Sequence, residues 1–230
     1  MKELTPTQKK ISLVLKLVVI LSAVLGTFLS AYAGRRAFMG GRTVFMYFTI
    51  QSNIAIALIC AVGCFLMLRG AKVSQALHVI KFVGTVAITL TGVVFVVLLA
   101  PTLGPLAWNV QNTLTHVVVP VAAVADFFVT SSGAGIPKKH VFYVTVPPLL
   151  YALYARIGYV LGWEFAEGIH YPYFFLNWGS PAGAFGFTKE LPFMGCVWWI
   201  LVLLLFLVAV GLGYLALAKA LGKKRTDKKR

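Results

Sequence analysis

Six stretches of this chain are long and apolar enough to cross a lipid bilayer, and they dictate its fold class. They run over Ile11–Tyr32, Val44–Leu68, Val79–Ala100, Asn109–Thr130, Val141–Gly162 and Phe193–Leu217. Crossing the hydrocarbon layer takes about 20 helical residues, and a backbone in lipid has to satisfy its own hydrogen bonds. The sequence therefore predicts an all-α integral membrane bundle of six transmembrane helices, forming one domain over residues 1–230.

The charged residues support this conclusion and set an orientation. The chain is 60% hydrophobic and 12% charged, with a formal net charge of +15. Its Lys and Arg lie in the tails and in short loops, which is typical of membrane topology and argues against a nucleic-acid partner. Cytoplasmic segments carry the excess of basic residues, so we expect both termini in the cytoplasm. The inner basic residues would be Lys2, Lys9, Lys10, Arg69, Lys72, Lys81, Lys138, Lys139 and a basic cytoplasmic tail over residues 218–230, and the outer ones Arg35, Arg36, Arg42 and Lys189.

Two polar clusters lie inside the apolar stretches, where polar groups without partners are costly. One covers Tyr47–Asn53 and the other Asn112–His116. With the N-terminus inside, Thr49 lies roughly 8 Å, His116 roughly 10 Å and Arg156 roughly 9 Å below the outer ends of their helices. We therefore predict that three unusual side chains from three helices share one depth.

Helical spacing adds neighbours to this predicted site. Asn53 lies one turn from Thr49 on the same helix face, and Asn112 lies one turn from His116. Asp126 is roughly 15 Å deeper than His116, too far to orient it as the acid of a triad. We assign Asp126 to the inner end of its helix, paired with a lysine from a loop.

These side chains also have ordinary structural explanations. A threonine in a spanning helix often donates to the carbonyl four residues earlier, as we expect for Thr85, Thr89 and Thr91. Asn side chains often join helices, and Arg156 could extend its charge to the interface. The spacing of His and Cys favours neither a metal site nor a haem, so we expect no metal and no cofactor.

The loop Trp163–Leu191 is rich in aromatic residues. Aromatic rings favour the membrane interface, which is the structural interpretation. A loop of this length in a compact protein is usually functional, and the functional interpretation is a lid over the polar site. Tyr171 and Tyr173, on either side of Pro172, would stiffen such a lid.

Four segments of the chain form an ordered set. They are YFTIQSN at Tyr47–Asn53, then Asn112, His116 and Pro120 followed by Asp126, PPLLYALYARIG at Pro147–Gly158, and YPYFFLN at Tyr171–Asn177. In these segments the chain resembles the androgen-induced-gene-like membrane proteins, most closely their bacterial six-span branch. Animal members of that family are intramembrane hydrolases of fatty acid esters of hydroxy fatty acids, with a threonine nucleophile and a histidine.

The resemblance implies a lipid ester hydrolase with Thr49 as nucleophile and His116 as base, acting on a membrane lipid or fatty acid ester. The chain has no G-x-S-x-G motif, the motif that places the nucleophile beside oxyanion donors in many hydrolases. Those donors would therefore be local, and Asn53, Asn112 and Arg156 are the candidates.

The alternative is a membrane protein without enzymatic activity, either a lipid-binding sensor or a small transporter. Transporters more often carry repeats and broken helices, and only Pro120 and Pro147-Pro148 indicate breaks in this chain. The basic tail is typical of a bacterial plasma membrane protein. The sequence therefore favours the hydrolase in that membrane.

Overall fold

A computed structural model describes residues 4–33, 41–131 and 135–227, and in these ranges the chain is helical, without a β-strand. Six helices are long and apolar enough to span a membrane, which confirms the all-α fold class and the predicted number of spans. They are Pro6–Tyr32, Phe48–Leu68, Gln75–Ala107, Val110–Ser131, Lys138–Val160 and Cys196–Lys223. The observed ends differ most from those predicted at the C-terminal ends of Gln75–Ala107 and Cys196–Lys223, which both extend further along the chain.

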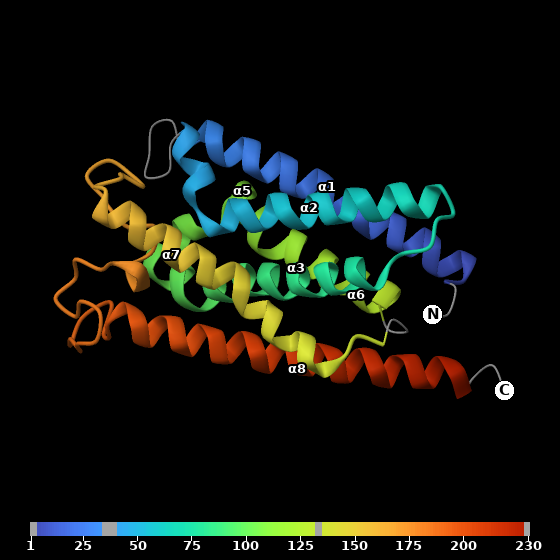
Figure 1. Cartoon of the computed structure of the whole chain (residues 1–230). Helices are drawn as coiled ribbons and strands as arrows, with labels where there is room; N and C mark the ends of the chain where they lie inside the picture. Colours follow the sequence, from blue (N-terminus) through green and yellow to red (C-terminus); the bar gives the residue numbers. More distant parts are fainter. Residues whose placement is uncertain (1–3, 34–40, 132–134, 228–230) are drawn as a thin grey trace.

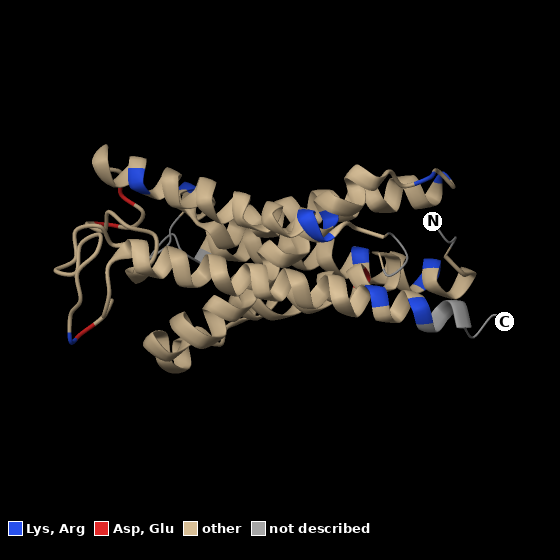
Figure 2. Cartoon of the chain, turned by 60° about the horizontal axis from the view of Figure 1, so that its bottom comes forward, with Lys and Arg blue, Asp and Glu red and all other residues tan. Residues whose placement is uncertain are grey.

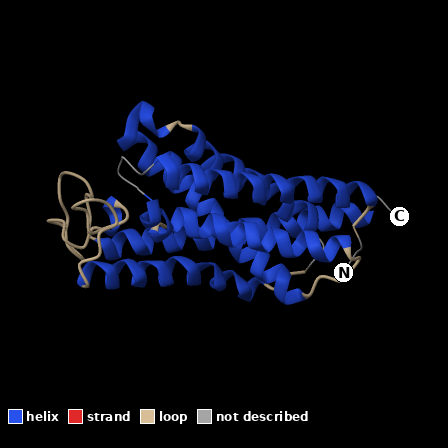
Figure 3. Cartoon of the chain, turned by 90° about the horizontal axis from the view of Figure 1, so that it is seen from above, coloured by secondary structure: helices blue, strands red, loops and turns tan. Residues whose placement is uncertain are grey.

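The helices run lengthwise through one elongated bundle (Figure 1). The long continuous helices are α1 (Pro6–Ala33), α2 (Phe48–Leu68), α3 (Gln75–Val94), α7 (Val146–Val160) and α8 (Cys196–Asp227). Helix α1 begins and α8 ends at the same end of the bundle, and the α7–α8 loop folds over the opposite end (Figures 1 and 3). The candidate lid therefore lies far from both chain ends.

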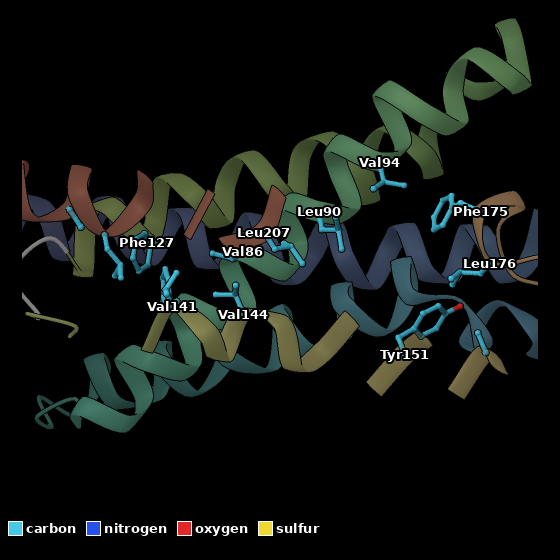
Figure 4. Close-up of a cluster of buried hydrophobic side chains, with 14 residues drawn as sticks. Val86, Leu90, Val94, Phe127, Val141, Val144, Tyr151, Phe175, Leu176 and Leu207 are labelled. Carbon is cyan, nitrogen blue, oxygen red and sulfur yellow. The ribbon is translucent and has the colours of Figure 1, made fainter. Parts of the chain in front are cut away.

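Helix α3 forms the centre of the bundle, because it contributes to both large groups of buried apolar side chains. One group joins α1, α2 and α3 to α6 (Val119–Ser131) through residues such as Val19, Ile56 and Ile88. The other joins α3 and α6 to α7, α8 and the last loop, and includes Phe82 and Phe127 (Figure 4). Many large apolar side chains remain exposed on the outside, as expected for helices that face lipid; examples are Leu21, Leu58, Leu150 and Leu205.

Two of the spanning segments contain a short π-helical turn, in which each N–H donates to the carbonyl five residues earlier. These turns are η3 (Phe95–Leu99) and η5 (Leu114–Val118). Each is followed after one residue by a proline, Pro101 or Pro120. Proline has no N–H, and its ring crowds the carbonyl of the residue four positions earlier. That residue is the central one of each turn, Val97 or His116. The sequence indicated a break at Pro120 and an end of the third span at Ala100, but it did not predict a π-turn at either place. The prolines explain why the turns widen.

Several short elements complete the spans. Helix α4 (Ala100–Leu103) and the 3₁₀ turn η4 (Gly104–Ala107) end the third, and α5 (Val110–Thr113) begins the fourth. The fifth begins with a 3₁₀ segment, η6 (Lys138–Thr145). Pro147 and Pro148 lack the N–H groups that an α-helix would use to bond the carbonyls of Tyr143 and Val144, so the chain is wound more tightly before them. The remaining 3₁₀ turns are η2 (Gly41–Met46) and η7 (Phe174–Leu176).

Charge is distributed unevenly along the bundle. Most Lys and Arg lie toward the end where α1 begins and α8 ends, and the glutamates of the α7–α8 loop lie at the opposite end (Figure 2). The predicted basic tail continues α8 as helix as far as Asp227. Residues 228–230 of the tail, and Arg35 and Arg36 of the first outer segment, lie outside the described residues.

Candidate functional site

Thr49 lies in the first turn of α2, where the backbone N–H groups have no partner inside the helix. Its N-cap residue, Tyr47, makes no side-chain cap. Instead the N–H of Thr49 donates to the hydroxyl of Tyr173 at 3.2 Å. The hydroxyl oxygen of Thr49 lies 3.3 Å from the same Tyr173 hydroxyl and 3.4 Å from Nε2 of His116. Thr49 is therefore placed between a histidine and a tyrosine.

The hydrogen bonds of His116 determine which of its ring nitrogens carries the proton. Nδ1 lies 3.0 Å from the carbonyl oxygen of Asn112 and 3.0 Å from the hydroxyl of Thr115. Since the Thr115 hydroxyl donates to the carbonyl of Gln111 at 2.9 Å, both neighbours of Nδ1 act as acceptors. Nδ1 is therefore assigned the proton. Nε2 is left with a lone pair that faces the Thr49 hydroxyl.

The π-turn η5 and close helix packing hold His116 in place. The ring of Phe95, from the other π-turn, stacks on the imidazole with centroids 3.9 Å apart. A Cβ added to Gly92 would lie 2.9 Å from the His116 carbonyl oxygen, and one added to Gly26 would lie 2.7 Å from Cγ2 of Thr115. The two glycines thus let α3 and α1 close onto the turn that carries the histidine.

Asn53 connects the two halves of the site. Its side chain is fully buried, and its amide nitrogen donates to the carbonyl of Thr49 at 2.8 Å and to that of Thr115 at 3.1 Å. Ser52 also donates to the Thr49 carbonyl, at 3.0 Å, and lies 2.7 Å from the Thr91 hydroxyl. The structure therefore commits the Asn53 amide to joining helices and not to facing a substrate at Thr49.

The other two candidate oxyanion donors are directed elsewhere. The amide of Asn112 donates to the carbonyl of Ala107 at 2.9 Å. Arg156 is exposed, and its guanidinium lies over the rings of Trp178 and Tyr159, 4.9 and 5.5 Å from their centroids. Its predicted place beside Thr49 and His116 is not what the structure shows.

An apolar cavity adjoins the site. Among its lining residues are Thr49 and Tyr173, and the others are Phe48, Leu90, Thr91, Val94, Leu99, Pro148, Tyr151, Ala152, Phe175, Leu176, Ile200, Leu203 and Leu204. The last loop provides one wall through Tyr173, Phe175 and Leu176, and Tyr171 lies half-buried two residues before Tyr173. His116 does not line the cavity, so a molecule in it reaches Thr49 from the side of Tyr173.

Asp126 does not pair with a loop lysine. Its partners are Lys16 and Lys81, which lie inside helices α1 and α3, and all three side chains are buried. Ser12 donates to its Oδ1 at 2.5 Å, and Lys81 also donates to Thr130 at 2.8 Å.

The predicted bonds of Thr85, Thr89 and Thr91 to the carbonyl four residues earlier are confirmed.

The structure thus brings Thr49, His116 and Tyr173 together and leaves the Asn112 amide and Arg156 apart from them. The contact between Tyr173 and Thr49, 124 residues apart in the chain, had no signal in the sequence beyond the aromatic loop. Neither a family model, nor a curated protein, nor a solved structure matches the chain. The family resemblance stays a prediction.

Proposed function

We propose that the protein is an intramembrane lipid ester hydrolase in which Thr49 is the nucleophile and His116 the general base. One observation carries the proposal: the Thr49 hydroxyl lies 3.4 Å from Nε2 of His116, and the bonds of Nδ1 leave that nitrogen as the acceptor. Threonine is a weak nucleophile and needs a base within hydrogen-bond reach, although such bonds are often long before substrate binds.

The reaction would proceed in two half-reactions. The Thr49 oxygen bonds to the acyl carbon while Nε2 of His116 takes the hydroxyl proton. The bond from the acyl carbon to the alcohol oxygen then breaks, and the alcohol leaves with the proton from His116. Water attacks the acyl-threonine, again giving a proton to Nε2, and the acid leaves as the proton returns to Thr49.

The cavity supports an acyl chain as the bound group. Its lining residues are uncharged and mostly apolar, so burying an alkyl chain there gains about 0.8 kcal/mol per methylene. Arg156, which carries a charge that suits a carboxylate of the substrate, lies outside this lining. The substrate class is therefore an ester of a long-chain acid, and the resemblance favours fatty acid esters of hydroxy fatty acids.

The location and orientation belong to the same proposal. The helices suit an integral membrane protein, and we place it in a bacterial plasma membrane. Basic residues are concentrated toward the end where α1 begins and α8 ends (Figure 2), and basic segments stay in the cytoplasm. Both termini would then be cytoplasmic, with Thr49 in the outer half of the bilayer.

The test uses the full chain in lipid nanodiscs, with a fluorophosphonate probe and a long-chain ester as substrate. We expect Thr49→Ala to abolish labelling and His116→Ala to lower kcat about a thousandfold or more. Thr49→Ser keeps a hydroxyl and should retain labelling. Thr145→Ala and His140→Ala serve as matched controls, because both residues lie in η6, away from the cavity lining.

Two results would overturn the proposal. One is labelling that survives Thr49→Ala, and the other is unchanged ester turnover in His116→Ala. If the wild type binds long-chain esters but does not hydrolyse them, the cavity belongs to a non-enzymatic lipid-binding protein.

A further inference from the structure

The Thr49 hydroxyl has a different neighbour on each of two sides. His116 Nε2 lies on one side at 3.4 Å and the Tyr173 hydroxyl on the other at 3.3 Å. Thr49 and Tyr173 line the cavity and His116 does not. An ester carbonyl arriving through the cavity would therefore meet Thr49 beside Tyr173, with the base behind the nucleophile.

The Thr49 backbone N–H provides one donor at that position. As a first-turn N–H of α2 it has no partner within the helix, and the Tyr173 hydroxyl accepts it at 3.2 Å. An oxyanion formed at Thr49 needs donors within about 2.7–3.1 Å of its oxygen. The Tyr173 hydroxyl therefore occupies the position at which the carbonyl oxygen of a bound ester would accept a hydrogen bond from the Thr49 N–H.

Tyr173 is held firmly and stays protonated. Its ring stacks on Phe175 with centroids 5.1 Å apart and meets the edge of Tyr47 at 5.9 Å. Tyr47 is itself fixed, since its hydroxyl donates to the carbonyl of Phe165 at 3.0 Å. Burial raises the pKa of the Tyr173 phenol above its usual value, so the hydroxyl keeps its proton at neutral pH and can donate it in a hydrogen bond.

We propose that Tyr173 is a catalytic residue that donates a hydrogen bond to the oxyanion of the acyl group, together with the backbone N–H of Thr49. As the Thr49 oxygen bonds to the acyl carbon, the carbonyl oxygen becomes negative and takes a place between the two donors. The hydrogen bond from the Thr49 N–H to the Tyr173 hydroxyl breaks. The N–H and the hydroxyl then each donate a hydrogen bond to the oxyanion. The phenol keeps its proton throughout. This inference rests on the hydrolase proposed above.

This role differs from two others that a tyrosine here could have. A general acid would give its proton to the departing alcohol, which matters only when that alcohol is a poor leaving group. A gate would control entry to the cavity and so change KM. An oxyanion donor acts in every acyl transfer, whatever the leaving group, and its loss lowers kcat.

The experiment compares Tyr173→Phe with the wild type in nanodiscs on two esters of one long-chain acid, a 4-nitrophenyl ester and a simple alkyl ester. We expect kcat to fall about a hundredfold on both esters, with KM changed less than about threefold. Phenylalanine keeps the ring contacts, and the exposed Tyr143 provides the matched control Tyr143→Phe.

Each other outcome overturns the inference. Loss confined to the alkyl ester would make Tyr173 a general acid, and a change confined to KM would make it a gate. Full activity in Tyr173→Phe, with Thr49→Ala and His116→Ala inactive, removes the oxyanion role and leaves the hydrolase intact. Full activity in all three variants removes the proposed roles of Thr49 and His116 as well.

Discussion

Asn53 holds the proposed nucleophile Thr49 and the proposed base His116 in register, although its side chain bonds to neither the hydroxyl nor the imidazole. Its amide donates to the carbonyls of Thr49 and Thr115, one on each of the two helices. Both bonds are buried, where breaking them leaves carbonyls without water to replace the donor. The residue thus fixes how α2 lies against η5, and the distance from Thr49 to His116 follows from that.

We predict that Asn53→Ala lowers the free energy of unfolding by about 1–3 kcal/mol. It should also lower kcat at least tenfold, because the dyad loses its spacing. Thermal unfolding in detergent and ester turnover measure the two effects. Gln51→Ala is the control on the same helix, since Gln51 is exposed and its side chain donates to the carbonyl of Phe45. An Asn53→Ala variant as active and as stable as that control would contradict the prediction.

The sequence identified the two residues of the proposed dyad, but not the hydrogen bonds that hold them in place. Depth and family resemblance both pointed to Thr49 and His116, and the structure sets them 3.4 Å apart. The amides of Asn53 and Asn112 were expected at the substrate and instead bond to backbone carbonyls. Helical spacing gives the face on which a side chain lies. It does not give the rotation and approach of neighbouring helices, which decide what that side chain meets.

Gly92 determines how closely α3 approaches the π-turn that carries His116. A Cβ at this position would lie 2.9 Å from the His116 carbonyl oxygen and 3.3 Å from the Pro120 ring. That carbonyl is the one that Pro120 cannot bond in helical fashion. The position of His116 therefore depends on the missing N–H of Pro120 in α6 and on the missing side chain of Gly92 in α3.

We predict that Gly92→Ala lowers kcat at least tenfold while the protein still folds, because α3 and η5 must separate by some tenths of an ångström. A shift of this size at a catalytic group is costly, since a misplacement of about 1 Å can cost a hundredfold. Kinetics on the 4-nitrophenyl ester would measure it. Gly213→Ala is the control, since Gly213 lies exposed on α8 with open space around it. Equal activity in both variants would show that the close approach is not needed.

The six helices were predictable because hydropathy and length alone identify a membrane span. The π-turns were not, although Pro120 was visible as a break. A proline shows that a helical bond is missing, but it does not show whether the helix kinks, ends or widens. Phe95 and His116 each lie in one of these π-turns and stack on one another, and the sequence did not predict this contact either.

A buried charge cluster joins three helices of the bundle, and it was the main feature of the whole molecule that sequence analysis missed. Lys16 on α1 and Lys81 on α3 both bond to Asp126 on α6. The sequence assigns no role to Lys16 within its apolar stretch, and it places Lys81 among the basic residues at the inner end of the third span. Their partner could not be identified, because a pair separated by 110 residues leaves no pattern in the sequence.

We predict that Asp126→Asn destabilises the fold by about 3–5 kcal/mol, because it leaves two lysine ammonium groups buried without a carboxylate. The loss of stability comes from the unpaired ammonium groups and not from the absence of a carboxylate as such. A variant that combines Asp126→Leu, Lys16→Met and Lys81→Met should therefore recover most of the lost free energy of unfolding. Apolar side chains of similar volume often replace a buried ion pair without cost. Thermal unfolding in one detergent compares the wild type, Asp126→Asn and the triple variant.

If Asp126→Asn were as stable as the wild type, the cluster would not hold α1, α3 and α6 together. If the triple variant were no more stable than Asp126→Asn, the loss would come from packing and not from unpaired charge.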